Sequence, residues 1–246
     1  MYFFLKKTAL SCFVLFLLSF SALSIALSLS VPNFKAEYKL SHNGIEIGRV
    51  KLSLKALDNN QYQLISSTQT SGLFAFVRDD DVVQSSLFEL NQKHIRPLSY
   101  QYKQSQGGNL KNIKLHFDWQ NSILTNSSEG TDWMINISTG VLDKALMQVA
   151  LMLDLKGPEK LLSYKVADGG KLKHYTFKQV GTENITVAGQ SYETIKLARK
   201  KNGKPLVTYY WCATALHNLP VLLQRKRTYG TFEMRLQTVQ FDPLTP

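Results

Sequence analysis

From Phe34 onward, apolar and polar residues alternate along most of the chain, a pattern typical of strands with one buried and one solvent-facing side. In RVKLSLKAL (residues 49–57) and NIKLHFDW (residues 112–119), about every second residue is apolar. Turn-forming pairs such as Asn43-Gly44 and Asn202-Gly203 separate such runs. The spacing fits a sheet, a sandwich or a barrel, and we expect a large curved antiparallel sheet or open half-barrel of about a dozen strands.

One segment, STGVLDKALMQVALMLDLKGP (residues 138–158), breaks this alternation. It is apolar on nearly every side apart from a narrow polar stripe, so the pattern predicts a buried helix over Val141–Leu155 that covers the concave side of the sheet. Ser138 or Thr139 is expected to cap its start, and Gly157-Pro158 to end it. Since no linker rich in Pro, Gly or Ser divides the chain, residues 34–241 are expected to form a single β-rich domain.

The stretch VADGGKLKHYTF (residues 166–177) contains two adjacent glycines beside an acidic residue, which raises the question of a phosphate site. A phosphate-cradling loop needs its glycines to open a helix, so that backbone N–H groups converge on the anion. Here strand-like runs lie on both sides of the glycines. Asp168-Gly169-Gly170 is therefore predicted to be a tight hairpin.

The N-terminal residues resemble a secretory signal. Lys6 and Lys7 precede an uncharged run that ends in small residues, which predicts a signal peptide over residues 1–28 and an exported, periplasmic protein. An uncleaved membrane anchor is the competing interpretation. Cleavage would lower the formal net charge from +11 to +9, which favours anionic partners, and it would leave Cys212 as the single cysteine. We expect Cys212 to be a small core residue rather than a redox group.

No stretch carries a catalytic signature, because nucleophile elbows, P-loops and dinucleotide-binding fingerprints are all missing from the sequence. The acidic run Arg78–Asp81 lacks the further ligands of a calcium loop, so a solvated turn is favoured over a cation site. We expect neither an enzyme nor a bound metal or cofactor. The histidines are widely separated and none pairs at metal-ligand spacing: His42, His94, His116, His174 and His217.

Two groups of residues are candidates for binding. The apolar stretch GLFAFV (residues 72–77) is expected to fold inward or line an opening, and methionines of the predicted helix suit an adaptable surface. The candidate ligand-binding residues are Leu73, Phe74, Phe76, Leu146, Met147, Met152 and Trp211. A basic C-terminal region interleaved with aromatics suits an anionic partner other than nucleic acid, although a merely solvated sheet face is an equal alternative. Its candidate residues are Arg199, Lys200, Arg225 and Arg227.

Several segments resemble, in order, a known exported bacterial family catalogued as domain of unknown function 3108. They include FKAEYKLSHNGIEIGRVKLSL near the start, the stretch VADGG followed by KLKHYTF, and a tryptophan, Trp211, eight residues before Leu219-Pro220-Val221. The resemblance implies a periplasmic location and brings no catalytic residues.

Three hypotheses follow for the function. The first is a non-enzymatic periplasmic protein that binds a hydrophobic or amphipathic ligand, such as a lipid, on the concave face of the sheet. The second is an envelope scaffold or assembly factor that docks to anionic polymers or to a membrane surface through the basic sheet. The third is a hydrolase whose site converges only in the fold.

Overall fold

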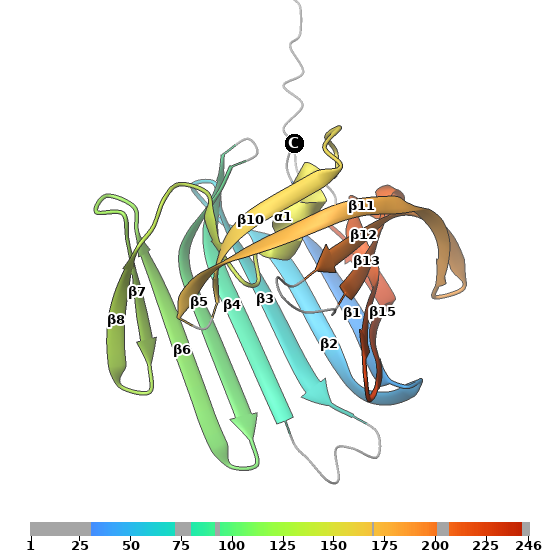
Figure 1. The fold of residues 1–246 in the computed structure, drawn as a ribbon, viewed down its shortest axis with the longest axis horizontal. Coiled ribbons are helices and arrows are strands. Elements are labelled where there is room, and N and C mark those ends of the chain that lie inside the picture. Colours follow the sequence, from blue (N-terminus) through green and yellow to red (C-terminus); the bar gives the residue numbers. More distant parts are fainter. Residues whose placement is uncertain (1–30, 72–79, 92–93, 169, 201–206, 243–246) are drawn as a thin grey trace, which may run out of the picture.

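The computed structural model describes residues 31–71, 80–91, 94–168, 170–200 and 207–242. Within these residues, fifteen strands and one short α-helix form the fold (Figure 1). The elements are β1 (Phe34–His42), β2 (Ile45–Ala56), β3 (Gln61–Thr70), β4 (Asp80–Asn91), β5 (His94–Gln106), β6 (Asn109–Asp118), β7 (Ile123–Ser128), β8 (Thr131–Asn136), β9 (Val141–Asp143), α1 (Met147–Asp154), β10 (Leu161–Asp168), β11 (Lys171–Val187), β12 (Gln190–Lys200), β13 (Val207–Ala213), β14 (Leu219–Arg227) and β15 (Gly230–Phe241).

All fifteen strands belong to one sheet in the order β8-β7-β6-β5-β4-β3-β2-β1-β15-β14-β13-β12-β11-β10-β9. The chain forms a meander from β1 to β8, then returns through β9 and α1 to a second meander from β10 to β15, which pairs with β1. Neighbouring strands are antiparallel except β9 and β10, which are parallel. The predicted large antiparallel sheet is confirmed, with fifteen strands instead of about a dozen. It spans Phe34 to Phe241, the range expected for one domain.

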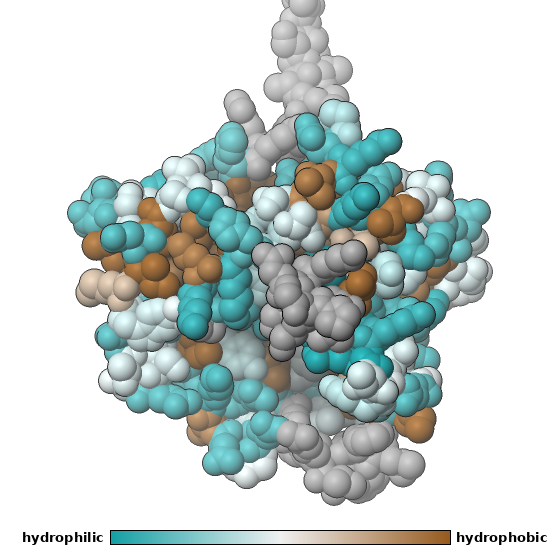
Figure 2. Space-filling model, viewed as in Figure 1, coloured by the Kyte–Doolittle hydropathy of each residue, from teal (hydrophilic) through white to brown (hydrophobic). Residues whose placement is uncertain are grey.

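The two edge strands of the sheet do not pair with each other, so the sheet is not a closed barrel, but it is strongly curved. Its two edge strands, β8 and β9, are joined by only four residues, 137–140. The end of β8 and the start of β9 therefore lie at most about 18 Å apart. In Figure 1, β10 and β11 pass across the curved part of the sheet that β2–β6 form. The helix α1 lies between these two strands and that part of the sheet. On the face seen in Figure 2, apolar side chains gather mainly at the left, over β7 and β8, among hydrophilic residues.

The alternation in the sequence explains the strands. In β2, Val50, Leu52 and Leu54 are buried while the intervening Lys51 and Lys55 are exposed. Asn43 and Gly44 form the two-residue turn between β1 and β2, with φ of 50° and 82°. Such left-handed pairs match the twist of a hairpin, as the sequence predicts.

The glycine turn between β10 and β11 is a hairpin as well. Asp168 pairs with Lys171 across it, and Gly170 has a φ of 77°. The prediction of a strand-to-strand corner rather than a phosphate loop is confirmed at this point.

The helix is shorter than predicted, and the prediction that it begins at Val141 is wrong. Val141–Asp143 instead form β9, because they pair with Lys165–Ala167 of β10, a partner that is distant in sequence. Neither Ser138 nor Thr139 caps the helix; Leu146 is the N-cap residue. The Asp143 carboxylate accepts the backbone N–H groups of Ala145 and Leu146 at 2.9 and 3.0 Å, which ends the strand and turns the chain into α1.

The helix α1 is eight residues long, too short to cross a bilayer, and no other helix in the described part of the chain is long and apolar enough to do so. The predicted signal peptide, residues 1–28, lies outside the described residues.

Candidate functional site

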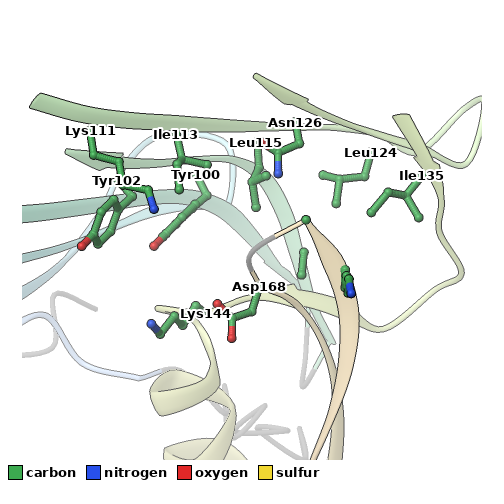
Figure 3. Close-up of a pocket in the computed structure, with 13 residues that line it drawn as sticks. Tyr100, Tyr102, Lys111, Ile113, Leu115, Leu124, Asn126, Ile135, Lys144 and Asp168 are labelled. Carbon is green, nitrogen blue, oxygen red and sulfur yellow. The ribbon is translucent and has the colours of Figure 1, made fainter. Parts of the chain in front are cut away.

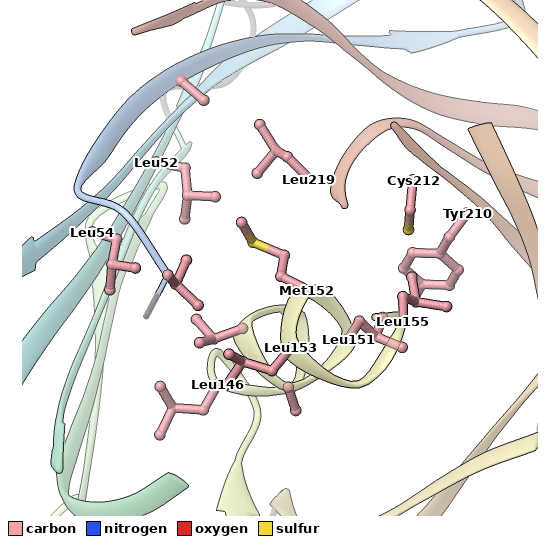
Figure 4. Close-up of a cluster of buried hydrophobic side chains, with 14 of the residues drawn as sticks. Leu52, Leu54, Leu146, Leu151, Met152, Leu153, Leu155, Tyr210, Cys212 and Leu219 are labelled. Carbon is pink, nitrogen blue, oxygen red and sulfur yellow. The ribbon is translucent and has the colours of Figure 1, made fainter. Parts of the chain in front are cut away.

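The concave face of the sheet is filled largely by α1. Val149, Met152 and Leu153 are at most 1% exposed, and they join the main apolar core. Figure 4 shows Met152 extending from the helix toward Leu219, while Leu151 lies toward Tyr210. Most of the helix is therefore core, as its nearly uniform apolarity predicts.

One side of α1 does not reach the sheet and leaves a cavity of about 220 Å³, called here the α1 cavity. This volume equals that of about seven water molecules in the liquid. Apolar side chains from α1 and from both halves of the sheet line it, together with amides, hydroxyls and two cationic residues. The lining residues are Leu52, Leu64, Ser66, Gln84, Lys144, Ala145, Met147, Gln148, Leu151, Arg199, Tyr210, Pro220, Leu223 and Met234.

The register of the sheet explains why this cavity is apolar at one end and cationic at the other. Cross-strand partners face the same side of a sheet, and residues two positions apart along a strand return to that side. One row across β12 to β1 is apolar: Leu197, Tyr210, Leu223, Met234 and Leu40. The next row on the same side is mainly polar and basic, with one aromatic member, Phe232: Arg199, Thr208, Arg225, Phe232 and His42. Charge and apolar surface thus meet at the cavity.

Arg199 is held at this boundary by two aromatic rings. Its guanidinium carbon lies 4.9 Å from the centre of the Tyr175 ring and 5.9 Å from that of Tyr210. Such stacking fixes the guanidinium and leaves its N–H donors directed past the rings. The second cation of the cavity, Lys144, comes from the turn before α1, next to the buried Asp143.

A second cavity, of about 190 Å³, lies between the β5–β8 part of the sheet and the turn joining β10 and β11; we call it the hairpin cavity. Figure 3 shows Asp168 and Lys144 on one side of it and Tyr100 and Tyr102 across from them. Lys144 lines both cavities, so the two lie next to each other. The Tyr100 hydroxyl donates to Gln84 of the α1 cavity at 2.9 Å, so these two side chains link the linings of the two cavities.

The carboxylate of Asp168 is already satisfied inside the protein. Lys173 and the Tyr175 hydroxyl donate to the same oxygen at 2.9 and 2.6 Å. Burial alone would raise the pKa of Asp168, but these bonds and the charge of Lys144 hold the pKa below its ordinary value. Burial and the bond to Asp168 raise the pKa of Tyr175 to about 12. Asp168 therefore organises the wall beneath Arg199 and stays charged.

The structure separates the predicted ligand-binding residues. Met147 lines the α1 cavity. Leu146 and Met152 are fully buried and belong to the core around the helix. Trp211 lies on the opposite side of β13 from Tyr210, where its indole N–H donates to Glu183 at 2.7 Å, so it does not line the cavity. Leu73, Phe74 and Phe76 lie outside the described residues.

The structure brings only some of the residues predicted to bind an anionic partner close to one another. Arg199 lines the α1 cavity, and Arg225 follows in the same cross-strand row, with Thr208 between them. Arg227 is two residues farther along the same side of β14. Lys200 belongs to β12, and its side chain lies outside the described structure.

Several cavity residues have no distinguishing sequence signal. Leu52, Leu64, Leu223 and Met234 are ordinary inward positions of alternating strands, and the sequence does not show that they lie beside a void. Besides the predicted Met147 and Arg199, the polar stripe of the predicted helix, Lys144 and Gln148, is an available signal, since both residues line the cavity. A polar stripe on a buried helix indicates where the helix is not covered by the core.

The described residues offer few groups that could bind a metal ion or act as a nucleophile. Within the described residues, no three His, Cys, Asp or Glu side chains come together in a group able to hold a metal ion. Cys212 is completely buried, and burial raises the pKa of its thiol, so the thiol stays protonated and behaves as an apolar side chain. The described lining of the α1 cavity includes neither a carboxylate nor an imidazole.

A family model described as a protein of unknown function, DUF3108, matches residues 34–237. The chain belongs to this family. The DUF3108 sheet is similar to the crystal structure of a beta-barrel-like protein of domain of unknown function DUF1849 from Brucella abortus, with a TM-score of 0.62 and 8% identity over 87% of this chain and 99% of that chain. At this identity the similarity extends to the fold alone.

A second solved structure, called a "putative lipoprotein", comes from Parabacteroides distasonis. It has a TM-score of 0.33 and 9% identity, over 85% of this chain and 96% of that chain. A search of curated proteins found no significant match.

Proposed function

We propose that this DUF3108 protein is exported to the periplasm and binds an amphipathic ligand in the α1 cavity without chemically changing it. The observation that carries the proposal is the lining of that cavity, which joins apolar side chains from both halves of the sheet to two cationic side chains, Arg199 and Lys144. Ligand sites of this kind combine a mostly apolar surface with a few placed polar groups.

The composition of the described cavity lining supports binding rather than catalysis. Its functional groups are a guanidinium, an ammonium, amides and hydroxyls. General acid–base or nucleophilic catalysis usually needs a carboxylate, imidazole or thiol within hydrogen-bond reach of the reacting atom. The buried carboxylate of Asp143 is bonded to Ser86 and to two backbone N–H groups, which commits it to holding the turn before α1.

The volume of the α1 cavity limits the ligand. About 220 Å³ is below the range of sites that enclose a drug-sized molecule, roughly 300–1,000 Å³. A ligand that fills the α1 cavity with part of an acyl chain and leaves its head at the basic boundary fits this size. The adjacent hairpin cavity adds further room beyond Lys144.

The alternative, an envelope scaffold that docks to anionic polymers, is less well supported. Arg199 lines the α1 cavity on the concave side of the sheet, and Arg225 lies in the same cross-strand row on that side. A polymer strand docking on the outer face of the sheet would not meet these groups.

Thermal melting with single-chain lipids tests the proposed function. A ligand that binds only the folded state raises the melting temperature as its concentration rises. Ser66→Leu places a larger apolar side chain in the α1 cavity, whereas Ser67→Leu makes the same change on the opposite side of β3. We expect the wild-type protein and Ser67→Leu to be stabilised by lipid and Ser66→Leu to lose this response. Equal responses in the two variants would contradict binding in the cavity.

A further inference from the structure

The basic row beside the α1 cavity, together with Arg227 two residues farther along β14, contains hydrogen-bond donors that the protein itself does not use. The Nε atoms of Arg225 and Arg227 are buried and have no hydrogen-bond partner in the described structure. Burying such a donor without a partner is costly, and more so when the group is charged. Each of these two guanidiniums therefore has a buried donor that the described residues do not satisfy.

The neighbourhood of the two guanidiniums is positive. Burial lowers the pKa of Arg225, and the nearby positive charges of Arg227 and Arg199 lower it further. Arg199, Arg225 and Arg227 form no salt bridge within the described part of the chain. The neighbouring acid, Glu233, pairs instead with Arg235 at 2.8 Å, and Glu233 is the partner of Gln224, on the other side of β14.

The geometry of the row suits a compact anion. Arg199 and Arg225 lie two strands apart with Thr208 between them, so their backbones are roughly 10 Å apart and their side chains can converge. Thr208 is buried. At the far end of the same row, the Nε2 atom of His42 is also buried without a partner in the described structure. Guanidinium groups match the planar, multidentate acceptors of phosphate and carboxylate groups.

We infer that Arg199, Arg225 and Arg227 bind the anionic head of the ligand, a phosphate or a carboxylate, while its apolar tail enters the α1 cavity. This inference rests on the proposed function, because it assigns the head of the same ligand. The bound anion supplies acceptors to the unpaired Nε donors and offsets the positive charge of the three guanidiniums. Arg199 marks the junction, since it lines the cavity and also belongs to the basic row.

Four probe molecules distinguish binding of the ligand's anionic head from binding of its apolar tail. Lysophosphatidic acid, lysophosphatidylcholine and monoacylglycerol with the same acyl chain vary only the head, and glycerol 3-phosphate supplies the head without a tail. Binding is measured by titration calorimetry with the purified protein at fixed ionic strength. We expect lysophosphatidic acid to bind at least about tenfold more tightly than the monoacylglycerol, in line with hydrogen bonds between charged groups.

Neighbouring residues of β14 provide a matched control. Arg225→Gln and Arg227→Gln each remove one guanidinium, while Lys226→Gln removes a cation from the exposed side of the same strand. Arg225→Gln and Arg227→Gln should each weaken lysophosphatidic acid about tenfold or more and leave the monoacylglycerol unchanged. Lys226→Gln should leave both affinities near those of the wild type. Melting curves without ligand confirm that each variant folds.

The outcomes distinguish this inference from the proposed function. Equal affinity for the anionic and neutral lipids, or equal effects of Arg225→Gln and Lys226→Gln, would overturn the anionic-head assignment while leaving tail binding in place. If glycerol 3-phosphate binds as tightly as lysophosphatidic acid, and Arg225→Gln weakens both, the anion site stands and the role of the cavity in holding a tail is contradicted.

Discussion

The hydroxyl group of Ser86 in β4 donates a hydrogen bond to the carboxylate of Asp143 in β9. These residues belong to strands that are far apart in the order of the sheet, so the hydrogen bond crosses the space enclosed by the curved sheet. Both side chains are completely buried. Because Asp143 also accepts the backbone N–H groups of the turn before α1, this pair ties the start of the helix to β4.

Asp143 should make stability depend on pH. Burial raises the pKa of Asp143 from 3.8 to about 6, against the opposing effects of the bonds from Ser86 and the two backbone N–H groups. A carboxyl group whose folded-state pKa is raised favours folding when protonated, and this contribution is lost as the pH rises through the folded pKa. We expect a loss of about 3 kcal/mol between roughly pH 4 and pH 6.5.

The measurement is urea unfolding of the wild-type protein and of Asp143→Asn over this pH range. The substituted amide stays neutral and its carbonyl can still accept the two N–H groups, so the stability of the variant relative to the wild type should increase as the pH rises. A constant difference across the range would show that the pKa of Asp143 is not raised.

The hairpin glycine should be needed for space as well as for its backbone angle. A Cβ atom on Gly170 would clash with the Trp133 ring, whereas one on Gly44, which also has a positive φ, meets nothing within 4 Å. Gly44→Ala is therefore expected to cost about 1 kcal/mol of unfolding free energy, and Gly170→Ala about 2–4 kcal/mol.

The clash can be checked with a double-mutant cycle. Trp133→Ala removes the ring that the new methyl group meets, so the cost of Gly170→Ala should fall toward that of Gly44→Ala in this background. If the cost is the same with and without Trp133, the contact between β8 and the hairpin does not constrain position 170.

The sequence predicts the fold well where one side of a strand is polar. In β2, Val50 and Leu52 alternate with lysines, so the inward face is explicit. The strand β9 is missed because it has three residues and pairs with β10 through parallel contacts that no local pattern reveals. Without β9, the apolar pattern places the beginning of α1 at Val141 instead of Met147.

The candidate site is predictable only in part, for a related reason. The strand β13 is apolar or aromatic on both sides, so the sequence does not show that Tyr210 faces the cavity while Trp211 faces away. The basic residues are visible in the sequence, but their place on the concave side follows from the register across β12, β13 and β14. A void beside a helix depends on how side chains fill a volume, which periodicity does not describe.

Adjacent helix residues should differ in their roles. Leu146 is fully buried in the core, so Leu146→Ala should cost about 2–5 kcal/mol of unfolding free energy. Met147 lines the α1 cavity, where its removal enlarges an existing space, so Met147→Ala should cost less and should alter lipid affinity. Denaturant unfolding and lipid titration of both variants give the comparison. A larger stability loss for Met147→Ala would contradict this division.

Cys212 should be unreactive in the folded protein. Its thiol is completely buried, and its pKa is raised by burial, so the reactive thiolate is scarce. Labelling with a thiol reagent at about pH 8, near the ordinary pKa of a thiol, should be slow in buffer and become rapid in denaturant. Fast labelling of the native protein would indicate that β13 opens or that Cys212 has a chemical role.

The central claim is that the folded protein holds an amphipathic ligand in the α1 cavity. Native mass spectrometry of protein purified without detergent from its own periplasm tests it most directly. We predict a discrete adduct with the mass of one anionic, acyl-containing molecule, retained by Ser67→Leu and lost by Ser66→Leu. Wild-type protein that carries no adduct and takes up no added single-chain lipid, or an adduct equally present in both variants, would contradict the account.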